Sequence, residues 1–139
     1  MTLRYLLDTA VLSEPIVKKP DPAVLARLEE HGAACATAAP IIHELRYGAL
    51  LLSPSRRRKA IERYVDEVVL RIYPVLPYDH AGAERHAEER ARLARLGRPA
   101  PFVDSLIAAV AVSNGLTLVT RNVHDFHAFR DLSVESWHS

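Results

Sequence analysis

Short apolar runs that stop at a polar residue, each separated from the next by a helix-like stretch, constrain this fold more than any other feature. The clearest run is Leu116–Thr120 (LTLVT), which Arg121 and Asn122 follow, and Leu3–Leu7 is followed directly by Asp8. Runs of this length between turn residues predict buried β-strands. Three weaker strand candidates are Ala34–Thr37, Ile72–Leu76 and Leu132–Ser136.

Helical segments separate these strands. One is Pro22–His31, with Asp21 as the expected N-cap, Pro22 at the first helical position and Gly32 as the stop. The others begin at Pro40 and end before Pro54, then cover Ser55–Arg71, Asp79–Leu96 and Val103–Asn114. Alternating short strands and helices predict parallel pairing and an α/β three-layer sandwich with a central, mainly parallel sheet. Pro74 places the third strand at an edge or makes it short.

Length and composition limit the class of protein. The 139 residues, 49% hydrophobic and 25% charged, predict one domain over residues 1–139. The single Cys35 excludes an internal disulfide, and no apolar run approaches the ~18 residues of a membrane span, so we expect a cytoplasmic protein. The net charge of +1 neither requires nor excludes a nucleic-acid partner.

Acidic and amide side chains occupy the positions where such sheets bind ligands, beyond the carboxyl ends of the strands. Asp8 and Asn122 each follow a strand, Asp125 comes three residues later, and Glu44 and Asp104 lie on helices. Each has a structural explanation by itself. Asp8 or Asn122 would serve as a helix N-cap, Asp104 would favour the first turn of its helix, and Glu44 would be exposed.

The same carboxylates, brought together, favour a metal site. Converging carboxylates raise one another's pKa unless a cation lies between them. Oxygen ligands without a Cys or His cluster favour Mg²⁺ or Mn²⁺ over Zn²⁺, and the seven histidines show no convincing zinc-ligand pairing. We therefore expect a divalent-metal site.

Four segments carry a family resemblance, in the family's order. They are YLLDT (5–9), HELRYGALLL (43–52), VDSLIAA (103–109) and LTLVTRNVHDF (116–126). The chain resembles the PIN-domain ribonucleases, specifically the VapC-type toxins of bacterial toxin–antitoxin pairs. The resemblance covers essentially the whole chain, including GRPAP before Asp104 and Trp137 in the tail.

The resemblance implies cleavage of RNA that depends on Mg²⁺ or Mn²⁺. It matches Asp8, Glu44 and Asp104 to the family's metal-binding acids, and it leaves Asn122, Asp125 or both for the fourth position. Thr9 would donate a hydrogen bond to a carboxylate or phosphate. The candidate RNA-contacting cations are Arg46, Arg57 and Arg121, whose alternative role is in ordinary salt bridges. A homodimer and a cognate VapB-type antitoxin are the implied partners.

Two other functions remain open on the sequence. A phosphatase or receiver-like protein would use Asp8 as a phosphoryl acceptor, but haloacid-type phosphatases need a second Asp two residues later, where this chain has Ala10. A non-catalytic module would keep the fold and bind an antitoxin or RNA without cutting. Ala10, where relatives usually carry Asn, and the uncharged Asn122 keep that alternative open.

Overall fold

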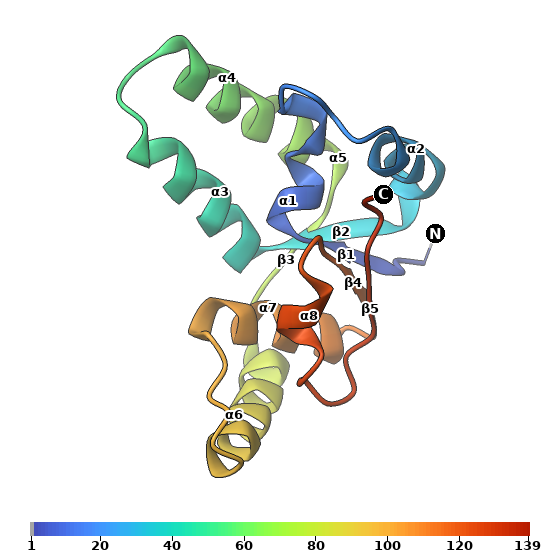
Figure 1. The fold of residues 1–139 in the computed structure, drawn as a ribbon, viewed down its shortest axis with the longest axis vertical. Coiled ribbons are helices and arrows are strands. Elements are labelled where there is room, and N and C mark those ends of the chain that lie inside the picture. The colour runs from blue at the N-terminus through green and yellow to red at the C-terminus, as the bar shows by residue number, and fades with distance from the viewer. Residues whose placement is uncertain (1) are drawn as a thin grey trace.

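A five-stranded parallel sheet forms the centre of the computed structural model, which describes residues 2–139 (Figure 1). The strands are β1 (Tyr5–Leu7), β2 (Cys35–Ala38), β3 (Val75–Leu76), β4 (Thr117–Val119) and β5 (Val134–Glu135). Their order across the sheet is β3-β2-β1-β4-β5. The predicted parallel α/β architecture is therefore confirmed.

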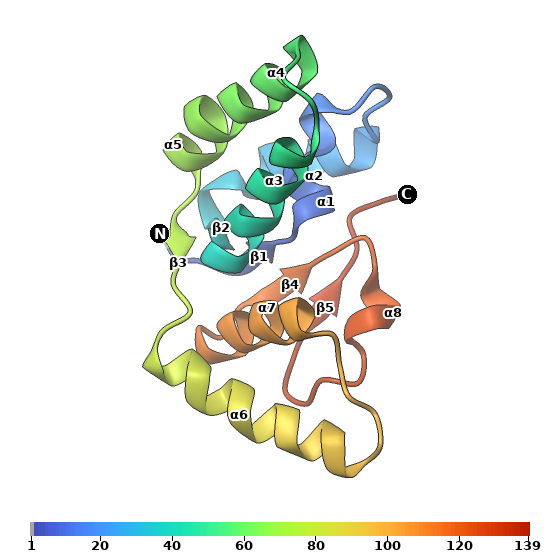
Figure 2. The same cartoon turned by 90° about the vertical axis from the view of Figure 1, so that its left-hand side faces the viewer.

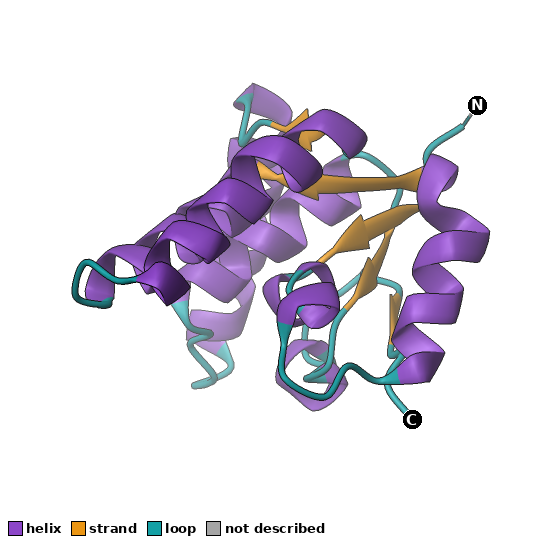
Figure 3. Cartoon of the chain, turned by 90° about the horizontal axis from the view of Figure 1, so that it is seen from above, coloured by secondary structure: helices purple, strands orange, loops and turns teal. Residues whose placement is uncertain are grey.

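Helices lie on both sides of the strands, as the view from above shows (Figure 3). They are α1 (Thr9–Leu12), α2 (Pro22–His31), α3 (Ala39–Leu51), α4 (Arg56–Tyr64), α5 (Leu70–Ile72), α6 (His80–Arg95), α7 (Phe102–Ser113) and α8 (Val123–Phe126). Short 3₁₀ turns η1 (Glu14–Ile16) and η2 (Gly32–Ala34) and a π-helical turn η3 (Val65–Val69) complete the chain. Figure 2 shows α1 to α5 toward one end of the long axis and α6 to α8 toward the other. Among residues 2–139, no helix has the length and apolar character needed to cross a membrane.

Local sequence signals explain where the predictions succeed and where they fail. The bounds of α2 are as predicted, and Asp21 caps it by accepting a hydrogen bond from the amide of Ala23 at 2.9 Å. The predicted strand Ile72–Leu76 begins too early, because Ile72 is the last residue of α5. Its observed part, β3, is an edge strand, as the proline predicted.

The core is built on β1 and β4. Leu6 and Leu7 of β1 and Leu118 of β4 are fully buried, as a strand covered on both faces requires. Helix α7 packs against β4, and its buried residues include the small Ala108 and Ala111 beside Ile107 and Val110. The small residues let α7 lie close to the sheet, which places its first turn near the strand ends.

The strand order reverses at β1. Strand β2 pairs with one side of β1 and β4 pairs with the other, with Leu7 opposite Val119. The carboxyl ends of β1 and β4 are therefore neighbours, and the residues that follow them meet. Ligands of open parallel sheets bind at such a position.

Candidate functional site

Asp8 is held at the end of β1 by backbone and side-chain hydrogen bonds. Its amide donates to the carbonyl of Val119 at 3.0 Å, which continues the pairing of β1 with β4. Its Oδ1 accepts from the amide of Thr9 at 2.8 Å, so Asp8 is the N-cap of α1. The capping role predicted for Asp8 alone is correct, and it fixes the direction of the half-buried carboxylate.

Thr120 holds the other oxygen of the same carboxylate. Its hydroxyl donates to Oδ2 of Asp8 at 2.8 Å and accepts from the amide of Asn122 at 3.1 Å. Thr120 is fully buried directly after β4. The sequence alone does not indicate a role for Thr120, because threonine is a common residue in β-strands and LTLVT is a strand pattern.

Two further carboxyl groups lie close enough to Asp8 to be affected by its charge. The pKa of Glu44, on α3, is raised mainly by burial and then by the charges of Asp8 and Asp104, with nearby His43 opposing the shift. The pKa of Asp104, in the first turn of α7, is also raised, mainly by burial and then by Asp8 and Asp125. Asp8 is thus the neighbour that Glu44 and Asp104 share.

The two candidates for the fourth site position, Asn122 and Asp125, are both exposed and lie in the loop and helix after β4. Asp125, in the first turn of α8, is near enough to Asp104 to contribute to its raised pKa. Asn122 occupies the predicted N-cap position of α8, but its side chain makes no capping hydrogen bond there. We call Asp8, Glu44, Asp104 and Asp125 the acidic cluster.

The donors of the acidic cluster suit a hard divalent cation. Oxygen is the only donor element in the cluster, and the hydroxyl of Thr9, next to Asp8, is buried with no hydrogen-bond partner among residues 2–139. In the same part of the chain, no three His, Cys, Asp or Glu side chains stand close enough together to hold a metal ion. Coordination by Asp8, Glu44 and Asp104 would therefore require these side chains to move closer to one another.

The three candidate cations differ in their surroundings. Arg46 of α3 forms an ion pair with Asp66 of η3, which is the alternative considered for it. Arg57 and Arg121 are exposed and make no salt bridge with any residue from 2 to 139. Arg121 lies close enough to Glu14 to contribute to lowering the pKa of that carboxyl.

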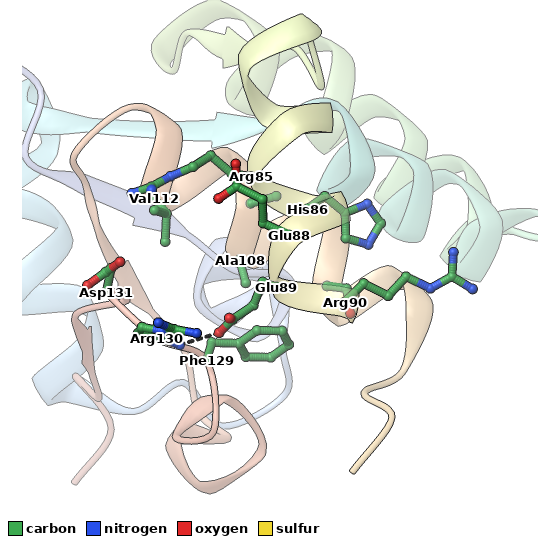
Figure 4. Close-up of a pocket in the computed structure, with 12 residues that line it drawn as sticks. Arg85, His86, Glu88, Glu89, Arg90, Ala108, Val112, Phe129, Arg130 and Asp131 are labelled. Carbon is green, nitrogen blue, oxygen red and sulfur yellow. Dashed lines mark hydrogen bonds between the residues drawn. The ribbon is translucent and has the colours of Figure 1, made fainter. Parts of the chain in front are cut away.

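A cavity of about 280 Å³ opens elsewhere, between α6, α7 and residues 129–131 (Figure 4). Glu89 is the charged lining residue whose side chain is held by hydrogen bonds within residues 2–139. Glu89 accepts hydrogen bonds from Arg92 at 2.6 and 2.7 Å and another from the amide of Arg130. None of the predicted site residues lines this cavity, so it is separate from the acidic cluster.

Comparison with known proteins gives matches over nearly the full length. The PIN domain family matches residues 5–132, a range that contains the whole acidic cluster. The tRNA(fMet)-specific endonuclease VapC of Shigella flexneri is 36% identical over 137 residues, which cover 97% of this chain and 98% of that protein.

Two solved structures have the same fold. FitAcB from Neisseria gonorrhoeae has a TM-score of 0.84 and 30% identity, covering 94% of this chain and 95% of that chain. DNA-bound VapBC from Salmonella typhimurium also has a TM-score of 0.84, with 29% identity and coverage of 98% and 99%.

Proposed function

This chain belongs to the PIN-domain family and is a VapC-type toxin, and from that premise we propose that it is a divalent-metal-dependent endoribonuclease. Relatives over its whole length are named as ribonucleases or endonucleases, which supports ribonuclease activity. The dependence on Mg²⁺ or Mn²⁺ and the roles of individual residues are the finer parts of the proposal.

The observation that carries the proposal is that Glu44 on α3 and Asp104 on α7 both lie close enough to Asp8 for its charge to act on them. Three carboxyl groups, one directly after β1 and the others on α3 and α7, repel one another. A divalent cation bound between them would offset this repulsion. A structural role alone does not explain why acids from three separate elements lie within range of one another's charges.

Each side chain has a distinct role in the proposal. Asp8 and Asp104 would hold the ion directly, and Glu44 would bind through water or orient the attacking water. Asp125, with Asn122, would complete the far side. When bound, the ion lowers the pKa of its water and offsets negative charge that develops on the phosphate.

The other residues would hold Asp8 and the substrate. Thr120 would keep the Asp8 carboxylate in place through its 2.8 Å hydrogen bond. The buried hydroxyl of Thr9 would donate to a phosphate oxygen, and Arg57 and Arg121, exposed and unpaired among residues 2–139, would contact the RNA backbone.

The proposed partner is a VapB-type antitoxin, with a homodimer as the assembled form of the toxin. The solved structures similar to this chain include VapBC from Salmonella typhimurium and FitAcB from Neisseria gonorrhoeae, and a DNA-bound FitAB complex is a further match. Such an antitoxin would keep the nuclease inactive until it is removed.

The test is cleavage of a structured RNA by the purified chain, freed of any antitoxin. A transfer RNA is a suitable first substrate, because the Shigella flexneri relative is named for tRNA(fMet). We expect cleavage in Mg²⁺ or Mn²⁺ that stops with EDTA and falls at least about 100-fold in Asp8→Asn and Glu44→Gln. Glu84→Gln, an exposed glutamate on α6, is the matched control and should cut normally.

Melting temperatures measured with and without Mg²⁺ distinguish a variant that no longer binds the metal from one that no longer folds. We expect added Mg²⁺ to raise the melting temperature of the parent and of Glu84→Gln, and to raise that of Asp8→Asn much less. Cleavage that persists in EDTA and in Asp8→Asn would contradict the mechanism. Tight antitoxin binding without cleavage of any RNA would favour the non-catalytic module.

A further inference from the structure

The hydroxyl of Tyr64, the last residue of α4, reaches α1, the short helix that begins directly after Asp8. It donates a hydrogen bond to the carbonyl oxygen of Leu12 at 2.6 Å, across a separation of 52 residues in the chain. In Figure 1, α1 lies beside the segment that runs from α4 to α5. The proposed mechanism gives no role to Tyr64, so this contact needs an explanation.

Helix α1 is too short to be stable by itself. It consists of four residues, Thr9–Leu12, whereas isolated helices shorter than about 12–15 residues are marginal in water. Val11 and Leu12 are fully buried, which fixes one face of the helix against the core. The last carbonyls of a helix have no partner within it, and Tyr64 supplies one to Leu12. The position of α1 therefore depends on Tyr64 as well as on the core.

The other end of α1 holds the carboxylate of Asp8. The amide of Thr9 donates to Oδ1 of Asp8 at 2.8 Å. The amides of Val11 and Leu12 donate to the backbone carbonyl of Asp8 at 3.1 and 3.0 Å, so the whole turn closes on this residue. Because a helix of one turn moves as a unit, a shift at Leu12 also moves the Thr9 amide and the carboxylate that it binds.

Tyr64 is held in place by the π-helical turn that follows it. In η3 the amide of Leu70 donates to the carbonyl of Val65, five residues earlier, and Val65 and Val69 are buried in the core. Single π turns within helices are frequent at functional sites. Burial raises the pKa of Tyr64, and nearby Tyr73 raises it further, so the hydroxyl stays protonated and remains a donor at neutral pH.

We infer that Tyr64 is a positioning residue for Asp8 and acts through α1. The hydroxyl of Thr120 holds Oδ2 of Asp8 directly, and the hydroxyl of Tyr64 fixes the helix whose first amide holds Oδ1. Coordination of an ion requires Glu44 and Asp104 to approach Asp8, so the position of Asp8 determines where the ion binds. This inference rests on the proposed metal-dependent function and adds a residue that controls how tightly the acidic cluster binds its ion.

The experiment removes single tyrosine hydroxyls and keeps the rings. Tyr64→Phe loses the hydrogen bond to α1. Tyr78→Phe is the matched control, because the hydroxyl of Tyr78 and Nδ1 of His86 are 2.8 Å apart and neither residue belongs to the acidic cluster. Each variant loses one tyrosine hydrogen bond, so a difference between them depends on where that bond lies.

Hydrogen exchange of backbone amides, followed by nuclear magnetic resonance without metal or RNA, measures how firmly α1 is held. We expect the amides of Thr9 and Leu12 to exchange at least about tenfold faster in Tyr64→Phe than in the parent or in Tyr78→Phe. The amide of Asp8 donates to Val119 at 3.0 Å and reports the pairing of β1 with β4, so its exchange rate should not change.

Mg²⁺ titrations, followed by melting temperature and by RNA cleavage, measure the effect on the acidic cluster. We expect Tyr64→Phe to need about three- to tenfold more Mg²⁺ for half-maximal cleavage and for a given rise in melting temperature. This is less than the ~10–100-fold typical for loss of a direct hydrogen bond to a metal ligand. Cleavage at saturating Mg²⁺ should stay close to that of the parent. Tyr78→Phe should lower the melting temperature and leave the Mg²⁺ requirement unchanged.

Other results would overturn the inference in distinguishable ways. Unchanged exchange in α1 would mean that Tyr64 does not hold the helix, and faster exchange with an unchanged Mg²⁺ requirement would mean that α1 does not control Asp8. Equal rises in the Mg²⁺ requirement of both variants would assign the effect to a general loss of stability. A parent whose melting temperature does not respond to Mg²⁺ would refute the metal site together with the positioning role.

Failure of the proposed ribonuclease activity alone gives a different result. In that case the parent binds Mg²⁺ but cuts no RNA, and a raised Mg²⁺ requirement in the melting temperature of Tyr64→Phe still supports the positioning role.

Discussion

At the scale of single residues, the sequence indicates which carboxylates belong to the candidate site, but not which side chains position those carboxylates. Asp8 stands out because a charged residue interrupts an apolar run, and the same is true of Glu44 beside the apolar stripe of α3. Thr120 does not stand out, since a buried threonine is common in strands. Its role depends on the pairing of β1 with β4, which joins residues 112 positions apart in the chain.

The contact between Thr120 and Asp8 predicts a positioning role. Thr120→Val removes the hydroxyl but keeps the shape, and we expect cleavage to fall about 10- to 100-fold and the Mg²⁺ needed for half-maximal activity to rise. Thr120→Ser should restore both. Thr37→Val is the matched control, because Thr37 is also fully buried but donates to the carbonyl of Leu7. If the two valine variants lose activity equally, Thr120 contributes only to the stability of the fold. A buried hydroxyl of this kind contributes about 1 kcal/mol to the free energy of unfolding.

At the scale of elements, capping residues predict helix bounds and apolar periodicity alone does not. Asp21, Pro22 and Gly32 define α2 correctly. The predicted helix Ser55–Arg71 consists of α4, the π-helical η3 and α5, because apolar spacing does not distinguish a π turn from an α turn.

The ion pair between α3 and η3 makes Arg46 a structural residue in our interpretation. With side chains 34% and 57% exposed, the pair of Arg46 and Asp66 should contribute about 0–1 kcal/mol to stability. We expect Arg46→Ala and Asp66→Ala to lower the free energy of unfolding equally, by less than about 1 kcal/mol in urea titrations. Neither should change RNA affinity more than about twofold. A loss of RNA affinity in Arg46→Ala alone would show instead that Arg46 contacts the substrate.

At the scale of the whole molecule, alternating strands and helices predict the parallel sheet but not the order of its strands. The order β3-β2-β1-β4-β5 arises from long-range pairing, and it alone explains why residues after β1 and β4 meet. The tail illustrates the same limit. Trp137 packs edge-on against Tyr5 of β1 with ring centroids 5.2 Å apart, and His138 reaches Glu14 at 3.1 Å. Nothing in the local sequence indicates that these residues are neighbours.

The pair of Glu14 and His138 links the two ends of the described chain and makes stability depend on pH. Glu14 is buried, and its pKa is lowered, mainly by the hydrogen bond from the amide of Asp21 and then by the hydrogen bond and charge of His138. Because the folded protein binds a proton at Glu14 less readily than the unfolded chain, this carboxylate stabilises the fold above the ordinary Glu pKa of 4.5. That contribution is lost as the pH falls through the lowered pKa of the folded state.

Glu14→Gln tests this dependence. Near pH 6 we expect the substitution to lower the free energy of unfolding by about 1–3 kcal/mol, because an amide replaces a buried, charged acceptor. The difference from the parent should shrink as the pH falls below about 4.5, since the parent then loses the same charge. Urea titrations across this pH range measure the difference, and Glu84→Gln, whose side chain is 66% exposed, should show almost none. A difference that stays constant down to about pH 2 would assign the effect to packing of the tail and not to the charge on Glu14.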